Sequence, residues 1–152
     1  MDEKDLKISL YQFCQTFIDE RSSRIQSQIK ELQTALDSET KSSAGDKHET
    51  GRAMLQLERE KLGLQLAEAQ DLNRVMQKID ISSKKTTAAL GSLVKTTKAN
   101  YFLAISAGEF KSGDSLNYCI SLNTPIGIML LGKTVGNIIS FNGKQIEILQ
   151  VH

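Results

Sequence analysis

Two carboxylates, Asp46 and Glu49, lie three residues apart in a short polar stretch, residues 42–51, between two long helical patterns. Carboxylate oxygens are the hard ligands that Mg²⁺ prefers, so this pair could contribute to a catalytic metal site. The same spacing also fits a capping box, with Asp46 at the N-cap and Glu49 at the third residue of the following helix. Taken alone, the pair favours capping, although a capping carboxylate keeps lone pairs for a second role.

Other catalytic chemistry is poorly supported by the sequence. It contains no phosphate-binding loop and no cluster of zinc ligands, and its cysteines and histidines have no spacing typical of a Cys-His nucleophile. Cys14 and Cys119 also lack redox or metal spacing, which predicts ordinary buried thiols in a reducing compartment. We therefore expect a chain that is not an enzyme by itself and has no cofactor of its own.

Charge and hydropathy limit the possible partners. The formal net charge is +1, which gives no argument for binding bare nucleic acid or an anionic membrane. No apolar run approaches the ~20 residues of a membrane-spanning helix. These features predict a soluble, cytoplasmic protein whose partners are recognised by local surfaces.

Long helical patterns flank the polar stretch. Residues 5–40 contain neither Pro nor Gly, and a one-sided apolar stripe runs through Ile18, Ile25, Ile29, Leu32 and Leu36. Residues 52–79 show a second, broader apolar pattern. Because neither stripe could be buried alone, the two segments are predicted to pair as an antiparallel coiled-coil hairpin over residues 1–80, with its tip near 42–51. About 30 helical residues give an arm on the order of 45 Å long.

The composition changes after a predicted linker at residues 81–87. Residues 88–152 are rich in β-branched residues, and apolar and polar residues alternate along them. Strands are expected at 89–96, 101–106, 116–122, 137–141 and 144–151. Asn142-Gly143 is a strong hairpin signal between the last two strands. Thr124 and Pro125 predict the capped start of a short helix that ends near Gly132. The fold class is therefore α+β, with the apolar residues 6–17 expected to pack on the second domain.

This arrangement resembles the Gre family of bacterial transcription elongation factors. One motif is TPIGIMLLGKTVG at residues 124–136 with the closing QIEIL at 145–149, similar to the family's Ser-Pro-Ile-Gly, Leu-Gly-Lys-x-x-Gly-Asp and Glu-Ile-Leu segments. The other is Gly45-Asp46-Lys47-His48-Glu49, similar to the Gly-Asp-x-x-Glu at the family's hairpin tip. The resemblance implies an FKBP-like domain at residues 88–152, without implying prolyl isomerase activity.

The resemblance also implies a function. In the family, the tip enters the secondary channel of RNA polymerase, where its acidic residues help to hold the second Mg²⁺ and stimulate cleavage of the 3′ end of a backtracked nascent RNA. It assigns this role to Asp46 and Glu49, with the ion shared with the polymerase rather than bound by this chain alone. It also assigns contacts at the channel rim to Thr124, Pro125, Ile126 and Gly127. We expect a monomer.

The tip departs from the family pattern, and this leaves alternatives open. Thr50-Gly51-Arg52 stands where the family continues with Asn, a second Glu and an aromatic residue, and Lys47, His48 and Arg52 dilute the negative charge. A secondary-channel regulator or antagonist without cleavage activity is therefore a second hypothesis. A third is a structural or non-catalytic adaptor protein whose coiled coil pairs with another coiled coil and whose tip merely caps a turn.

Overall fold

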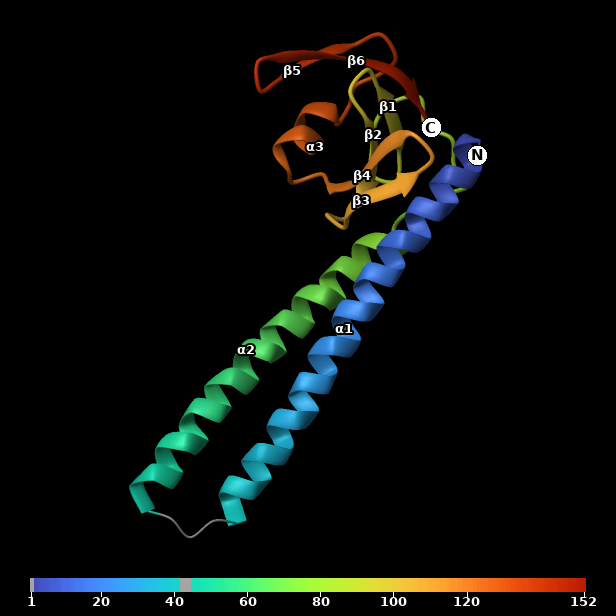
Figure 1. Cartoon of the computed structure of the whole chain (residues 1–152). Coiled ribbons are helices and arrows are strands. Elements are labelled where there is room, and N and C mark those ends of the chain that lie inside the picture. Colours follow the sequence, from blue (N-terminus) through green and yellow to red (C-terminus); the bar gives the residue numbers. More distant parts are fainter. Residues whose placement is uncertain (1, 42–44) are drawn as a thin grey trace. The chain divides into compact units, whose positions relative to one another are not determined.

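A computed structural model describes the backbone of residues 2–41 and 45–152 and the side chains of residues 2–39 and 49–152. Two helices come first, α1 (Glu3–Lys41) and α2 (Gly45–Gln77). The strands of a six-stranded sheet follow, with one short helix between the fourth and fifth strands. Figure 1 shows these elements along the chain. The predicted α+β fold class, a helical hairpin followed by a small β-rich part, is confirmed.

The chain divides into two compact units. One contains Met1–Phe17 together with Arg74–His152, and is called the sheet unit below. The other contains Ile18–Asn73 and is called the hairpin unit. The predicted domains, residues 1–80 and 88–152, are each one continuous stretch of chain. The compact units differ from them, because the first turns of α1 and the end of α2 group with the strands. The apolar residues 6–17 thus belong to the sheet unit, as their composition predicts.

The sheet has the strand order β3-β4-β2-β1-β6-β5. Its strands are β1 (Leu93–Thr96), β2 (Asn100–Ala104), β3 (Gly108–Ser112), β4 (Ser115–Ser121), β5 (Ile138–Phe141) and β6 (Lys144–Val151). Neighbouring strands are antiparallel except β2 and β4, which pair in parallel. The β5–β6 turn has Asn142 at φ 53° and Gly143 at φ 77°, the positive φ values that an Asn-Gly hairpin turn requires.

One face of the sheet packs under α3 (Pro125–Leu130), which lies between β4 and β5 in the chain (Figure 1). Side chains from four strands and from α3 form this core, including Val94, Tyr101, Leu103, Leu130, Ile139, Ile146 and Ile148. Tyr101 and Tyr118 on the paired strands β2 and β4 stack with ring centroids 6.0 Å apart. Burial of this apolar area is the main force that holds the unit together.

The other face carries the alternate residues of the same strands. Phe102 pairs with Cys119 across β2 and β4, and both side chains are buried. The buried Asn117 on this face accepts a hydrogen bond from Asn100 Nδ2 at 2.9 Å and donates to the Phe110 carbonyl at 3.1 Å. This pairing satisfies its amide, which is what allows a polar side chain to be buried there.

The hairpin unit is held by a narrow apolar seam. Among its described side chains, the buried apolar ones are Ile18, Ile25, Leu36, Leu62 and Ala69. Gln28, Leu32 and Ala35 of α1 line a shallow groove together with Glu58 and Leu62 of α2, which places these arms side by side. Each arm of this unit is on the order of 40 Å long at 1.5 Å per residue.

Several sequence predictions need correction. α2 begins at Gly45 rather than near residue 52, so residues 45–51 are helical and the break is shorter than predicted. Asp46 is the second residue of α2, and its side chain, on which the predicted cap depends, lies outside the described residues. Strand β3 was not predicted. It lies at the edge of the sheet, and its side chains are largely exposed, so it lacks the apolar alternation that marks a half-buried strand.

Candidate functional site

The end of the hairpin unit carries the predicted acidic pair. The helical bounds of α2 place positions 46 and 49 one turn apart. Glu49 is exposed, so its carboxylate is available to a partner, whereas the side chain of Asp46 lies outside the described residues. The predicted tip residues 42–44 also lie outside them.

A third carboxylate reaches this end from α1. A methyl group built on Gly51 would contact the carboxylate of Glu39 at 3.7 to 3.8 Å, so Glu39 lies across the hairpin from Gly51. Gly51 is two residues from Glu49 on α2. Glu39 could not be found from the sequence, because its place across from Gly51 depends on how the two helices pair.

Within the side chains of residues 2–39 and 49–152, no group of three or more His, Cys, Asp or Glu is arranged to hold a metal ion. The predicted role of Asp46 and Glu49 with Mg²⁺ stays a prediction.

The segment from Thr124 to Gly127 has a defined local geometry. Thr124 caps α3, since its Oγ1 accepts a hydrogen bond from the Gly127 amide at 3.1 Å and donates to the Ser121 carbonyl at 2.7 Å. Gly127 has no room for a side chain, because a Cβ would lie 2.3 Å from the Ser121 carbonyl oxygen. Pro125 follows the cap at the first helical position, as predicted.

These four predicted contact residues differ in exposure. Pro125 is exposed and Thr124 is half-buried, whereas Ile126 and Gly127 are buried and shape the segment from within. The exposed apolar residues follow them: Ile128 is 62% exposed, Met129 37% and Leu131 47%. We call these three residues the α3 apolar surface. They are available for contact where the predicted Ile126 and Gly127 are not.

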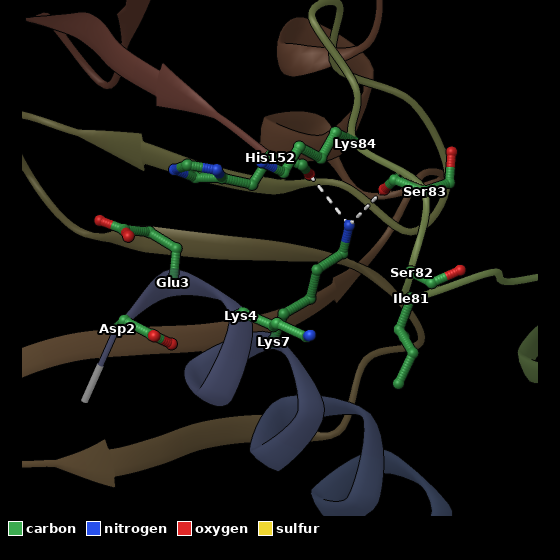
Figure 2. A pocket seen from close by; sticks show the side chains of 9 residues that line it. All are labelled: Asp2, Glu3, Lys4, Lys7, Ile81, Ser82, Ser83, Lys84 and His152. Atoms are coloured by element: carbon green, nitrogen blue, oxygen red, sulfur yellow. Dashed lines mark hydrogen bonds between the residues drawn. The ribbon is translucent and has the colours of Figure 1, made fainter.

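A separate cavity of about 310 Å³ lies within the sheet unit (Figure 2). Its lining residues are Asp2, Glu3, Lys4, Lys7, Ile81, Ser82, Ser83, Lys84 and His152. Lys7 is buried, and its Nζ donates to the Ser83 carbonyl at 3.1 Å and to the main-chain oxygen of His152 at 3.2 Å, as the dashed lines in Figure 2 show. Burial lowers the pKa of Lys7.

Lys7 joins the start of α1 to two other parts of the chain. Ser83 lies before the first strand, and His152 lies just after the last strand. Glu3 adds an ion pair with Lys95 of β1 at 3.1 Å. A hydrogen bond from its own backbone and the hydrogen bond from Lys95 lower the pKa of Glu3. Both amine groups are thus committed to contacts inside the unit. The contacts of Lys7 and Glu3 thus hold the start of α1 to the rest of the sheet unit.

Comparison with known proteins gives limited information. No protein-family model matches the chain, and no curated protein matches it. A solved structure titled "Structure of the transcription factor Gfh1" aligns with 89% of this chain and 90% of its own, with 17% identity and a TM-score of 0.34. At so low a TM-score, a proposal must rest on the residues and surfaces of the chain itself.

No helix of the described chain combines the length and apolar character that crossing a bilayer requires.

Proposed function

We propose that this chain is a transcription factor of the Gre type, which binds RNA polymerase and inserts the end of its helical hairpin into the secondary channel. The observation that carries the proposal is the Thr124–Leu131 segment. Its sequence resembles the family's Ser-Pro-Ile-Gly segment, and it forms a capped helix beside an exposed apolar surface in a chain that also contains a helical hairpin.

The α3 apolar surface is the proposed docking site. Single exposed apolar residues are ordinary, but Ile128 and Met129 of α3 and its C-cap Leu131 lie within four positions of each other, a local grouping of the kind that contacts another protein. The patch is built on a rigid base, because Ile126 and Leu130 of the same helix are buried in the sheet core. A rigid apolar surface loses little conformational entropy on binding.

The hairpin end supplies the proposed chemistry. Asp46 and Glu49 would add hard oxygen ligands to a Mg²⁺ that the polymerase already holds in part, and Glu39 lies near enough to strengthen the negative potential there. Such an ion stabilises the attacking and leaving oxygens of an in-line displacement, here the cleavage of a backtracked transcript. This chain would orient the ion and attract it, while the polymerase supplies the rest of the site.

Two alternatives have observations that favour them. Arg52 follows Glu49 by less than one turn, and its positive charge opposes Mg²⁺ binding, which favours a secondary-channel antagonist without cleavage activity. Met54, Leu57 and Leu64 on α2 are 66 to 69% exposed, an apolar stripe that favours an adaptor pairing with another helix.

The test adds the purified protein to stalled, backtracked elongation complexes of the polymerase from the same organism, with Mg²⁺ present. The proposal predicts transcript shortening that the Asp46→Asn, Glu49→Gln double variant abolishes. The matched control is Glu60→Gln, an exposed carboxylate on the same helix about 16 Å farther along. Binding without shortening would establish the antagonist, and absence of binding would refute the whole reading and leave the adaptor.

A further inference from the structure

The first turns of α1 hold a fixed register on the sheet. Leu6, Leu10 and Cys14 recur at intervals of four residues and are all buried, which defines the face of the helix that packs inward. Phe13 contacts Phe110 of β3, with ring centroids 5.3 Å apart. Phe13 thus anchors α1 over the β3–β4 edge of the sheet, and Cys14 is the next residue along the helix.

Strand pairing brings Cys119 to the same place. Cys119 on β4 lies opposite Gly108 of β3, and Asn117, two residues back along β4, lies opposite Phe110. Directly opposed residues of antiparallel strands point to the same face, so Cys119 shares the face that Phe110 presents to α1.

The two thiols meet in this buried position. Both cysteines are free and at most 1% exposed, and the Cys119 thiol donates a hydrogen bond to the Cys14 sulfur. The backbone amide of Ile105, just beyond β2, donates to the same sulfur. These two donors lower the pKa of Cys14, whereas donation and burial raise the pKa of Cys119.

We propose that Cys14 and Cys119 form a redox-sensitive pair, which hydrogen peroxide converts into an intramolecular disulfide that joins α1 to β4. Two contacting thiols on separate elements have the arrangement that this reaction needs. The pair was invisible in the sequence because its members are 105 positions apart. This inference is independent of the proposed function.

The reaction is balanced by the two thiols and one peroxide. The Cys14 thiolate attacks one peroxide oxygen and breaks the O–O bond, which gives a Cys14 sulfenic acid and one water once a proton is taken up. The Cys119 sulfur then attacks the Cys14 sulfur and expels the hydroxyl group, which leaves as a second water with the Cys119 proton. The cysteines lose two electrons, the peroxide gains them, and a thiol reductant reverses the change.

The consequence of the bond is a covalent hold on the first turns of α1. Residues 2–17 otherwise stay on the sheet through non-covalent contacts alone, such as those of Phe13 and Lys7. A bridge from Cys14 to Cys119 closes a long loop of chain, the case in which a disulfide restricts the unfolded state most. We expect the melting temperature to rise by roughly 5–10 °C on oxidation.

The test treats the full chain with hydrogen peroxide and analyses it by intact mass and by peptide mapping without reduction. The expected product has lost two hydrogen atoms, has gained no oxygen, and carries a peptide in which Cys14 is linked to Cys119, which dithiothreitol separates again. Chains linked to each other, oxygen added without the link, or thiols that stay unmodified while those of denatured chain oxidise would each overturn the proposal.

Two single variants assign the attacking sulfur. Cys119→Ser keeps a hydroxyl donor beside Cys14, so peroxide adds oxygen to Cys14, whereas Cys14→Ser slows oxidation of the remaining thiol by about tenfold or more. Equal oxidation rates in the two folded variants would contradict Cys14 as the attacking group. Peptide mapping of the unsubstituted chain decides the existence of the bond even if either variant fails to fold.

Discussion

The sheet unit and the hairpin unit are built on different principles. The sheet unit buries large side chains on both faces of its strands, among them Phe102, Leu103, Ile146 and Ile148. The hairpin unit buries only a seam, while Met54, Leu57 and Leu64 remain exposed on α2. Since buried apolar area provides most of the stability, the sheet unit is expected to carry the larger share of it.

This contrast separates stability from the proposed activity. The hairpin unit exposes Glu49 at its end, where the side chain buries no apolar area. It also contains Gly63 within α2, a residue that weakens a helix. The sheet unit instead provides a rigid base for the α3 apolar surface. Substitutions of buried residues should therefore affect folding mainly in the sheet unit, whereas substitutions at the end of the hairpin unit should affect the proposed cleavage.

The largest expected effect is that of Phe102→Ala in the sheet unit. Phe102 is fully buried, so its loss leaves a cavity and should lower the free energy of unfolding by about 3–5 kcal/mol. The paired change in the hairpin unit, Leu64→Ala, removes a side chain that is 69% exposed and should cost less than about 0.5 kcal/mol. Tyrosine fluorescence during urea denaturation reports on the sheet unit, because Tyr11, Tyr101 and Tyr118 all lie there. Circular dichroism at helical wavelengths reports on the hairpin unit. Equal losses would remove the contrast between the units.

Alanine at two glycines should have opposite effects. Gly127→Ala places a methyl group against the backbone oxygen of Ser121 and should destabilise the sheet unit by about 1–3 kcal/mol. Gly63→Ala meets only the flexible end of Arg59, at 3.2 Å, and should stabilise α2 by about 0.5–1 kcal/mol. Circular dichroism at helical wavelengths follows α2 during denaturation. A neutral Gly127→Ala would show that the segment is looser than the contacts indicate.

The cap of α3 should have a smaller effect. Thr124→Ala removes the acceptor for the Gly127 amide and should cost about 0.5–2 kcal/mol, whereas Thr124→Ser keeps the hydroxyl and should cost much less. Urea denaturation of the two variants provides the comparison. Equal losses would assign the effect to the lost methyl group instead of the cap.

The smallest effect is a change in pH dependence at Lys7. Burial lowers its pKa in the folded chain below the ordinary value of 10.5, so the unfolded chain binds more protons in the interval between these two values. The contribution of Lys7 to stability should therefore rise with pH through that interval, and Lys7→Met should lose this rise. Denaturation curves from neutral pH to 10.5 measure the difference between the two chains. Parallel curves would contradict the lowered pKa.

Local signals predicted much of the sheet unit. The Asn142-Gly143 turn and the Thr124-Pro125 cap each specify a backbone geometry through a few adjacent residues, and both predictions are confirmed. Strand β3 was missed because an exposed edge strand needs no apolar alternation. Its position depends on pairing with β4, which is not encoded within its own five residues.

The candidate sites were less predictable. The polar residues from Gly45 to Gly51 predicted a break, yet they form the first turns of α2. A polar sequence does not exclude a helix, because polar residues can occupy a helix that faces water. Cys14 and Cys119 meet only because α1 packs on the sheet, so no spacing in the sequence could indicate the pair. The α3 apolar surface was only partly predicted, because the motif does not show which of its residues are buried.

Binding to RNA polymerase tests the central claim most directly. Binding of the labelled chain to the purified core polymerase of the same organism should be saturable. Ile128→Lys on the α3 apolar surface should lower the affinity by about tenfold or more. The control is Leu116→Lys, a similarly exposed leucine at the opposite end of β4 from the Thr124 segment, which should leave the affinity unchanged. No measurable binding, or the same loss with both folded variants, would contradict the account.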